Sequence, residues 1–343
     1  MYQFLATTVF VLFFSGLAQA NPNWINQCDG HKDKSTVYGD LLAVLFDDYE
    51  AESCAELYDY LSQETEIDLT DYNLRDFSMI TEFQNVTELS VAINPVRDLS
   101  FLKRMPNLEV VDLSGCQFIT EAPELEFLPN LKEAIFELGG LRKAPSFHNQ
   151  ARLDSLDLSF NPLTDLTGLE GQSVREINLT GSELKNIDSL AYLRDVEIII
   201  LDMNELTSIM PLKDLTTLRE LSVDENVGIS LDLGGSQMPS LELLSSYESE
   251  ISTVSALSAF PNLRFLNLSR NKIVDVSGLE KLNSLKKLYL NDNAIKDVTS
   301  FKKAFHLETL DLRDNPLNDV WSLLDLIQNG TKVYHEDLDD DVF

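Results

Sequence analysis

The amino-acid sequence predicts an α/β repeat solenoid, with about 12 parallel strands on a concave face and short helical or 3-10 turns on a convex face. The segment LRFLNLSRNKI, residues 263–273, spaces its apolar residues in a way that fits neither a helix nor a strand alone. It fits a short strand that runs into a tight turn. The same spacing returns at 285–295 (LKKLYLNDNAI) and at 307–317 (LETLDLRDNPL). A unit that cannot bury its apolar side alone, and that repeats, indicates stacked coils.

Earlier copies of the unit follow the same spacing. The first apolar residue of each unit is, working toward the amino terminus, Leu263, Leu241, Leu218, Val196, Val174, Leu153, Leu131, Leu108 and Val86. An eroded first copy uses Ile67, Leu69 and Leu74. The pattern resembles the leucine-rich repeat family, L-x-x-L-x-L-x-x-N/C-x-L. The 22-residue period is similar to the internalin-type subclass, and this resemblance implies a horseshoe that binds other proteins.

The first element is an apolar leader. Residues 1–20, MYQFLATTVFVLFFSGLAQA, contain no charged side chain and end in the small-residue sequence Ala18-Gln19-Ala20. We interpret them as a secretory signal peptide. A membrane anchor is the alternative, but the apolar stretch is shorter than the ~20 residues that cross a bilayer. No later segment is apolar enough to cross, so we expect no membrane insertion and a secreted or periplasmic protein.

Residues 21–63 are predicted to form a helical amino-terminal cap, because the first coil of a solenoid needs a cover for its open core. Helical periodicity includes Leu41 and Leu45 and begins again near Leu57. Ser53 is placed to cap the second of these helices.

Two of the three cysteines lie within the predicted cap, on either side of its central segment. Export permits disulfides, so we expect a bond between Cys28 and Cys54. Cys116 lies at the Asn/Cys position of its repeat, and we expect it to be a buried turn residue.

The solenoid is predicted to cover residues 64–328. In its strands Leu266 and Leu268 point inward, whereas Phe265 and Asn267 point outward, because side chains alternate between faces. Asn271 lies where the chain leaves the strand, so its amide is expected to bond backbone groups that the turn leaves unpaired. Its equivalents are Asn94, Asn161, Asn204, Asn226, Asn293 and Asn315. Cys116, Ser182 and Ser249 replace the asparagine in three units.

Residues 318–328 are expected to close the last coil with Val320, Leu323 and Leu326. Residues 329–343 are expected to be an acidic tail that does not pack.

The sequence carries no pattern typical of catalysis. Its four histidines have no metal-ligand spacing with Cys or with one another, no Gly-rich phosphate loop follows a strand, and no G-x-S-x-G turn occurs. The acidic residues lack the D-x-D-x-D-G loop of a calcium site. We therefore predict a protein that is not an enzyme and that needs no cofactor or metal.

Charge narrows the class of partner. The formal net charge is −31, which disfavours nucleic acid and anionic membrane. A basic protein surface, calcium or simple solubility are the remaining explanations. Acidic residues at outward strand positions are Glu66, Asp68, Glu88, Asp112, Glu133, Glu137, Asp157, Glu176, Asp202, Glu220, Asp224 and Asp311. Only Lys287 and Arg313 are basic there, so we expect a protein partner with a basic patch, bound by a monomer.

The outward positions of the later coils also carry apolar and aromatic side chains, which is how protein-binding patches are built. The alternative is that a sheet simply favours Ile, Tyr and Phe. The predicted partner-binding residues are Glu176, Ile198, Ile200, Asp202, Glu220, Asp224, Leu243, Tyr247, Phe265, Lys287 and Tyr289. Two other functions remain open, an inhibitor or regulator of a secreted enzyme and a glycan-binding protein.

Overall fold

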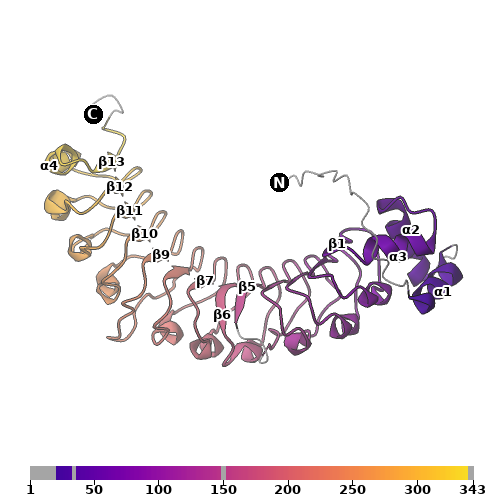
Figure 1. The fold of residues 1–343 in the computed structure, drawn as a ribbon. Helices are drawn as coiled ribbons and strands as arrows, with labels where there is room; N and C mark the ends of the chain where they lie inside the picture. Colours follow the sequence, from indigo (N-terminus) through magenta and orange to yellow (C-terminus); the bar gives the residue numbers. More distant parts are fainter. Residues whose placement is uncertain (1–20, 33–35, 148–151, 339–343) are drawn as a thin grey trace.

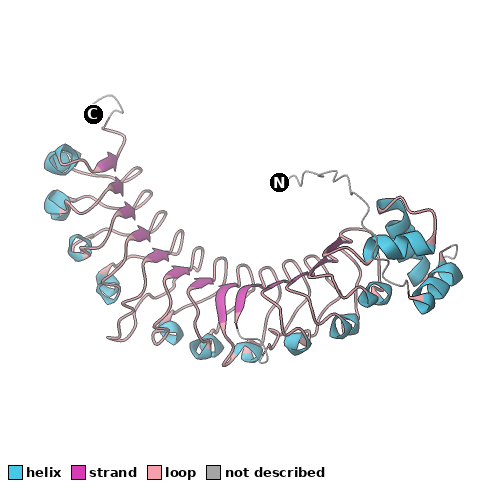
Figure 2. Cartoon of the chain, in the orientation of Figure 1, coloured by secondary structure: helices cyan, strands magenta, loops and turns pink. Residues whose placement is uncertain are grey.

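The computed structural model describes residues 21–32, 36–147 and 152–338, which form a curved solenoid (Figure 1). Within these ranges one parallel sheet of 13 strands runs in sequence order from β1 to β13. Figure 2 shows the strands along the inner, concave side of the curve and the short helical turns along its outer side. The predicted repeat solenoid is confirmed, with one strand more than the expected number.

The strands are β1 (Glu66–Asp68), β2 (Glu88–Ser90), β3 (Val110–Asp112), β4 (Glu133–Ile135), β5 (Leu153–Asp157), β6 (Val174–Asn178), β7 (Ile198–Ile200), β8 (Glu220–Ser222), β9 (Leu243–Ser245), β10 (Phe265–Asn267), β11 (Lys287–Tyr289), β12 (Thr309–Asp311) and β13 (Lys332–Tyr334). The outer 3-10 turns are η1 (Ser78–Glu82), η2 (Ser100–Arg104), η3 (Leu125–Phe127), η4 (Thr167–Leu169), η5 (Asp188–Tyr192), η6 (Met210–Leu212), η7 (Ser255–Ala259), η8 (Leu279–Lys281), η9 (Thr299–Lys303) and η10 (Val320–Leu323).

The core is a stack of equivalent leucines. Leu266 in β10 pairs in register with Leu244 in β9 and with Leu288 in β11, and all three are fully buried. Burial of each such side chain stabilises the fold by roughly 2 kcal/mol. Because every coil adds to the same core, no coil can be removed without exposing its neighbours.

The predicted asparagine ladder is confirmed. The Asn271 side-chain amide donates hydrogen bonds to the carbonyls of Leu268 (3.0 Å) and of Ser246 in the previous coil (2.7 Å). Its Oδ1 accepts from the Ile251 N–H at 2.8 Å. The same arrangement occurs at Asn94, Asn161, Asn204, Asn226, Asn293 and Asn315.

Shorter side chains fill the ladder position in three coils. Cys116 Sγ donates to the carbonyl of Val91 at 3.4 Å, and Ser182 Oγ donates to that of Leu158 at 3.3 Å. Ser249 follows the same rule. Cys116 is buried, with its thiol pKa raised mainly by that burial, as expected for a structural residue.

Three helices cover the amino-terminal end: α1 (Pro22–His31), α2 (Val37–Asp48) and α3 (Cys54–Leu61). The two helices predicted from leucine spacing correspond to α2 and α3. Ser53 caps α3, since its Oγ accepts a hydrogen bond from the Glu56 N–H at 3.2 Å. Helix α1 was not predicted. It buries only Trp24 and Cys28, so its sequence has little apolar periodicity.

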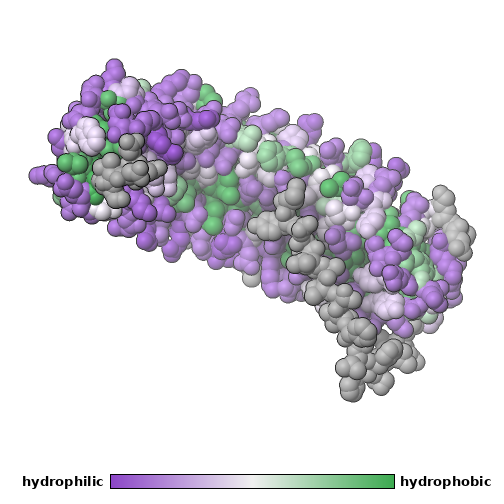
Figure 3. Space-filling model, turned by 90° about the horizontal axis from the view of Figure 1, so that it is seen from above, coloured by the Kyte–Doolittle hydropathy of each residue, from purple (hydrophilic) through white to green (hydrophobic). Residues whose placement is uncertain are grey.

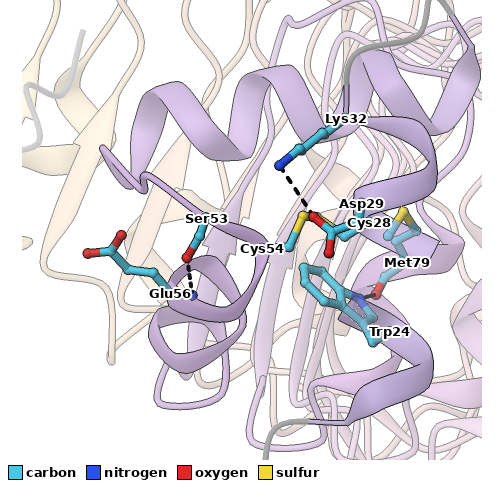
Figure 4. The surroundings of a disulfide bond; sticks show 8 residues. All are labelled: Trp24, Cys28, Asp29, Lys32, Ser53, Cys54, Glu56 and Met79. Atoms are coloured by element: carbon cyan, nitrogen blue, oxygen red, sulfur yellow. Dashed lines mark hydrogen bonds and ion pairs between the residues drawn. A yellow bond between two sulfur atoms is a disulfide. The ribbon is translucent and has the colours of Figure 1, made fainter. Parts of the chain in front are cut away.

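Figure 4 shows how α1 is held in place. The predicted disulfide between Cys28 of α1 and Cys54 of α3 is confirmed. Beside it, Trp24 Nε1 donates a hydrogen bond to the Met79 carbonyl in the first outer turn, η1, at 2.9 Å. Helix α1 is therefore joined to α3 by the disulfide and to the first coil by the Trp24 hydrogen bond.

The carboxyl-terminal end differs from the expectation. Val320 is buried and α4 (Leu324–Gln328) closes the last outer turn as predicted, but the chain then returns to the sheet. Strand β13 pairs with β12, and Leu338 is buried against Val320. The described part of the predicted acidic tail therefore packs, because β12 offers an unpaired edge that a further strand can satisfy.

The predicted signal peptide lies outside the described residues. In the part of the chain that the structure covers, no helix has the length and apolar character needed to cross a membrane.

Candidate functional site

The parallel register sorts the outward residues into continuous rows. One row follows the first strand position and contains Ile198, Glu220, Leu243, Phe265 and Lys287 in that order. Each of these residues comes from a neighbouring strand, β7 to β11. These five sequence-predicted residues therefore lie side by side on adjacent coils.

A second row follows the third strand position. It brings together Ile200, Ser222, Ser245, Asn267 and Tyr289. The Tyr289 ring lies 5.3 Å from the ring of Phe265 in the first row, measured between centroids. This contact joins the two rows into one surface.

The apolar side chains of the two rows are half-buried, and so is Tyr247 two residues after β9. The inward neighbours Ile199 and Leu244 are fully covered, as the alternation of faces requires. Figure 3 looks down on the open side of the curve, where hydrophobic side chains form a broken band among hydrophilic ones. We name Ile198, Ile200, Leu243, Tyr247, Phe265 and Tyr289 the concave patch.

Two acids at the margin of the concave patch form hydrogen bonds between coils. Asp202 Oδ1 accepts from Ser222 Oγ at 2.6 Å and from the Asp224 N–H at 2.9 Å. Asp224 Oδ1 accepts from Ser245 Oγ at 2.6 Å and from the Tyr247 N–H at 2.7 Å. These contacts fix the position of Tyr247 relative to β8.

The protonation of both acids is shifted in the same direction. Burial raises the pKa of Asp202 and of Asp224, although their hydrogen bonds act in the opposite direction. The hydrogen bonds of the two aspartates to the next coil were not predicted from the sequence. The available signal was a serine at the third strand position of the coil that follows each aspartate, at Ser222 and Ser245.

The other charged residues of the predicted concave face differ in their exposure to solvent and in their ion pairing. Glu220 and Lys287 are exposed, and half-buried Glu176 has Arg175 as an ion-pair partner at 3.4 Å. Asp311 is almost fully buried between β11 and β13, and its Oδ1 accepts a hydrogen bond from Arg313 Nε at 2.9 Å. Asp311 is therefore not a free charge on the concave face.

The amino-terminal half of the face is more uniformly acidic. Glu137 has its pKa raised by burial first and then by the nearby carboxylates of Asp157 and Asp112. None of these three carboxylates forms an ion pair with a cationic side chain of the described chain. Unbalanced negative charge favours contact with a basic surface.

Within the residues that the structure describes, no group of three or more His, Cys, Asp or Glu side chains is arranged to hold a metal ion.

Family models for leucine-rich repeats match the later coils. One model, of two repeat copies, matches residues 261–303, and a single-repeat model matches residues 303–320. The chain therefore carries leucine-rich repeats, and its fold is a leucine-rich-repeat solenoid. Such folds generally mediate binding between proteins.

One curated relative is a protein phosphatase 1 regulatory inhibitor subunit homologue of Arabidopsis thaliana. It is 27% identical over 170 residues, which are 47% of this chain and 51% of the relative. The matched region thus spans about half the length of that relative.

Two solved structures illustrate the fold. An internalin of Listeria monocytogenes is 20% identical, with a TM-score of 0.65, and the match covers 88% of this chain and 95% of the internalin. A chain of the mouse RP105/MD-1 complex is 21% identical, with a TM-score of 0.56, and the match covers 80% of this chain and 51% of that chain. At these identities the likeness concerns the fold.

Proposed function

We propose that this protein is an exported, non-enzymatic binding module of the internalin-type 22-residue subclass, which captures a partner protein on its concave sheet. The observation that carries the proposal is the concave patch. Five apolar or aromatic side chains of β7 to β11 lie in register, and Tyr247, two residues after β9, adjoins them. A solvated sheet has no need of such a concentration, whereas aromatic anchors are typical of protein-binding surfaces.

The proposed partner presents a basic surface with an apolar centre. Glu220 is exposed beside the patch, and Asp202 and Glu176, the latter ion-paired with Arg175, lie at its amino-terminal margin. Long-range attraction would orient a basic partner, and contact with Tyr247, Phe265 and Tyr289 would hold it. Asp224 has a second role, because its hydrogen bond to the Tyr247 N–H holds this segment in place before binding.

Three features support export. Residues 1–20 have the composition of a signal peptide. Cys28 and Cys54 are bonded, and disulfides persist in oxidising compartments. The likeness to an internalin, itself matched over nearly its whole length, is consistent with the same setting. We propose secretion or a periplasmic location, and a monomer.

The proposed division of the chain follows the same reasoning. Residues 1–20 are removed as a signal, 21–63 form the cap, and 64–328 form the solenoid. The proposed tail, 329–343, contributes β13 and Leu338 to the end of the solenoid.

Affinity capture with purified protein tests the function. The double variant Ile200→Glu/Tyr247→Glu places charge in the concave patch, and Val227→Glu/Val274→Glu adds the same charge at exposed turn positions outside it. We expect the first variant to lose the partner and the control to retain it. Equal capture by all three proteins would contradict the proposal. Circular dichroism would confirm that both variants remain folded.

An enzyme regulator is a second candidate, favoured by the similarity to a phosphatase regulatory inhibitor subunit homologue. In this case the concave patch would contact a secreted enzyme near its active site. Activity assays of secreted hydrolases with and without the protein would separate the two functions. Inhibition that is lost in Ile200→Glu/Tyr247→Glu would favour the regulator, whereas capture without any change in activity would favour simple binding.

A further inference from the structure

A row of residues immediately before the ladder positions shares one backbone conformation. In every coil from Asp71 to Asp314 this residue has a positive φ, between 51° and 69°. The row consists of Asp71, Ile93, Gly115, Leu138, Phe160, Gly181, Met203, Glu225, Glu248, Arg270, Asp292 and Asp314. Backbone hydrogen bonds connect its members to successive coils, for example from the Leu138 N–H to the Ser159 carbonyl at 3.1 Å.

The residue types in this row change along the solenoid. The left-handed region favours Gly, Asn and Asp, and it disfavours bulky or β-branched side chains. Even so, Ile93, Leu138, Phe160 and Met203 occupy it in the first half. Their side chains are 56%, 53%, 39% and 48% exposed, so burial does not compensate for the unfavourable conformation.

The second half of the row shows which residue types the same turn accepts. Glu225, Glu248 and Arg270 adopt the same φ, and Arg270 donates to Glu248 at 3.1 Å. The turn therefore accepts charged residues and does not require an apolar one. The backbone conformation of the turn therefore does not account for the apolar residues of the first half.

Two members of this row in the first half are glycines, and each lies against the apolar side chain of the coil before it. A Cβ atom on Gly115 would lie 3.2 Å from Ile93 Cγ1, and one on Gly181 would lie 2.6 Å from Phe160 Cδ1. Ile93 and Phe160 thus extend over the neighbouring coil, which glycine leaves open. We name Ile93, Leu138, Phe160 and Met203 the apolar ridge.

Acidic side chains accompany the apolar ridge. Glu137 directly precedes Leu138, and Asp112 and Asp157 belong to the coils on either side. These are the carboxylates without an ion-pair partner in the described chain. A ligand that matches both features is apolar on one face and cationic beside it.

We propose that the apolar ridge is a second docking surface, which binds a cationic amphipathic helix of a partner protein. Apolar residues of the helix would lie on Ile93, Leu138 and Phe160, and its Lys or Arg residues would meet Asp112, Glu137 and Asp157. Ile93 and Met203 are five coils apart, which is about 24 Å at ~4.8 Å per strand. A helix of about 16 residues has this length.

The test uses a fluorescent synthetic peptide of 16 residues, with Leu along one helical face and Lys on the others. Its affinity for the protein is measured by anisotropy at physiological salt. We expect Ile93→Asn/Leu138→Asn/Phe160→Asn to bind the peptide at least ~10-fold more weakly than the wild type. Because Asn tolerates the left-handed conformation, this variant should unfold at the same or a higher temperature. Loss of binding would then not reflect loss of fold.

Two controls locate the effect. Val227→Asn/Val274→Asn removes exposed apolar surface elsewhere and should bind as the wild type does. Ile200→Ser/Tyr247→Ser, in the concave patch, measures any binding of the peptide at that other surface, and a larger loss of affinity in this variant than in the ridge variant would also overturn the proposal. Equal affinity of the ridge variant and the wild type, or no binding of the peptide by the wild type, would overturn the proposal.

Discussion

Ser245 Oγ lies 2.6 Å from Asp224 Oδ1 and donates a hydrogen bond to it from the next coil. The same relationship joins Ser222 to Asp202 one coil earlier. Outward side chains thus connect the coils on the surface, in parallel with the asparagine ladder in the interior. These bonds underlie the first two predictions.

Ser245→Ala should lower the free energy of unfolding by about 1–2 kcal/mol, because it leaves a half-buried carboxylate with one donor fewer. Urea denaturation followed by circular dichroism measures the change. Ser252→Ala removes an exposed hydroxyl and should have almost no effect. An equal loss in both variants would show that the bond to Asp224 contributes nothing.

The raised pKa values of Asp202 and Asp224 predict a dependence on pH. The folded protein holds these two protons more tightly than the unfolded chain, so their contribution to stability is full below the ordinary pKa of 3.8. It is lost as pH rises through the raised folded values. Relative to wild type, Asp202→Asn/Asp224→Asn should therefore gain stability as pH rises from about 4. Urea midpoints measured across this range test it, and a difference that does not change with pH would contradict it.

Asn204 allows a graded test of the ladder. Its side chain donates to the Leu179 and Leu201 carbonyls and accepts from the Leu184 N–H, all in the buried turn. Asn204→Ala should cost about 3 kcal/mol or more, since several buried groups lose their partner. Asn204→Ser should cost less, because the hydroxyl of Ser182 forms a hydrogen bond to a backbone carbonyl at the equivalent position of the preceding coil. Denaturation midpoints in the order wild type, Ser, Ala are expected, and any other order would contradict the role of the side chain.

Loss of the disulfide should loosen the cap before the solenoid. The bond joins residues 26 positions apart, and closing a loop of this size is worth about 3.5 kcal/mol. We expect Cys28→Ser/Cys54→Ser to increase hydrogen exchange across α1 and α3 while β5 to β12 remain protected. Cys116→Ser serves as the control for loss of a thiol outside the cap. Uniform exchange along the whole chain would indicate that the cap and solenoid unfold as one unit.

Most of the fold could be predicted from the sequence, because the contacts that define it repeat. Leu266 meets Leu244 and Leu288 at fixed offsets, so periodic spacing reports a contact between coils. The ladder followed for the same reason, including its Cys116 and Ser182 variants. Helix α1 and strand β13 escaped prediction because each contributes few buried apolar residues, and β13 exists only because β12 has an edge to pair with.

The sequence by itself determined which residues face outward, and hence the membership of the concave patch. The tertiary structure decided what each of these residues is free to do. Asp311 is ion-paired with Arg313, Asp224 is hydrogen-bonded to Ser245, and Glu220 remains exposed, although all three are acidic residues at outward positions. It also decided that Ile93 and Phe160 are exposed in a left-handed turn. Periodicity encodes the direction of a side chain, whereas its exposure and hydrogen bonds depend on neighbours in other coils, which only the folded stack brings together.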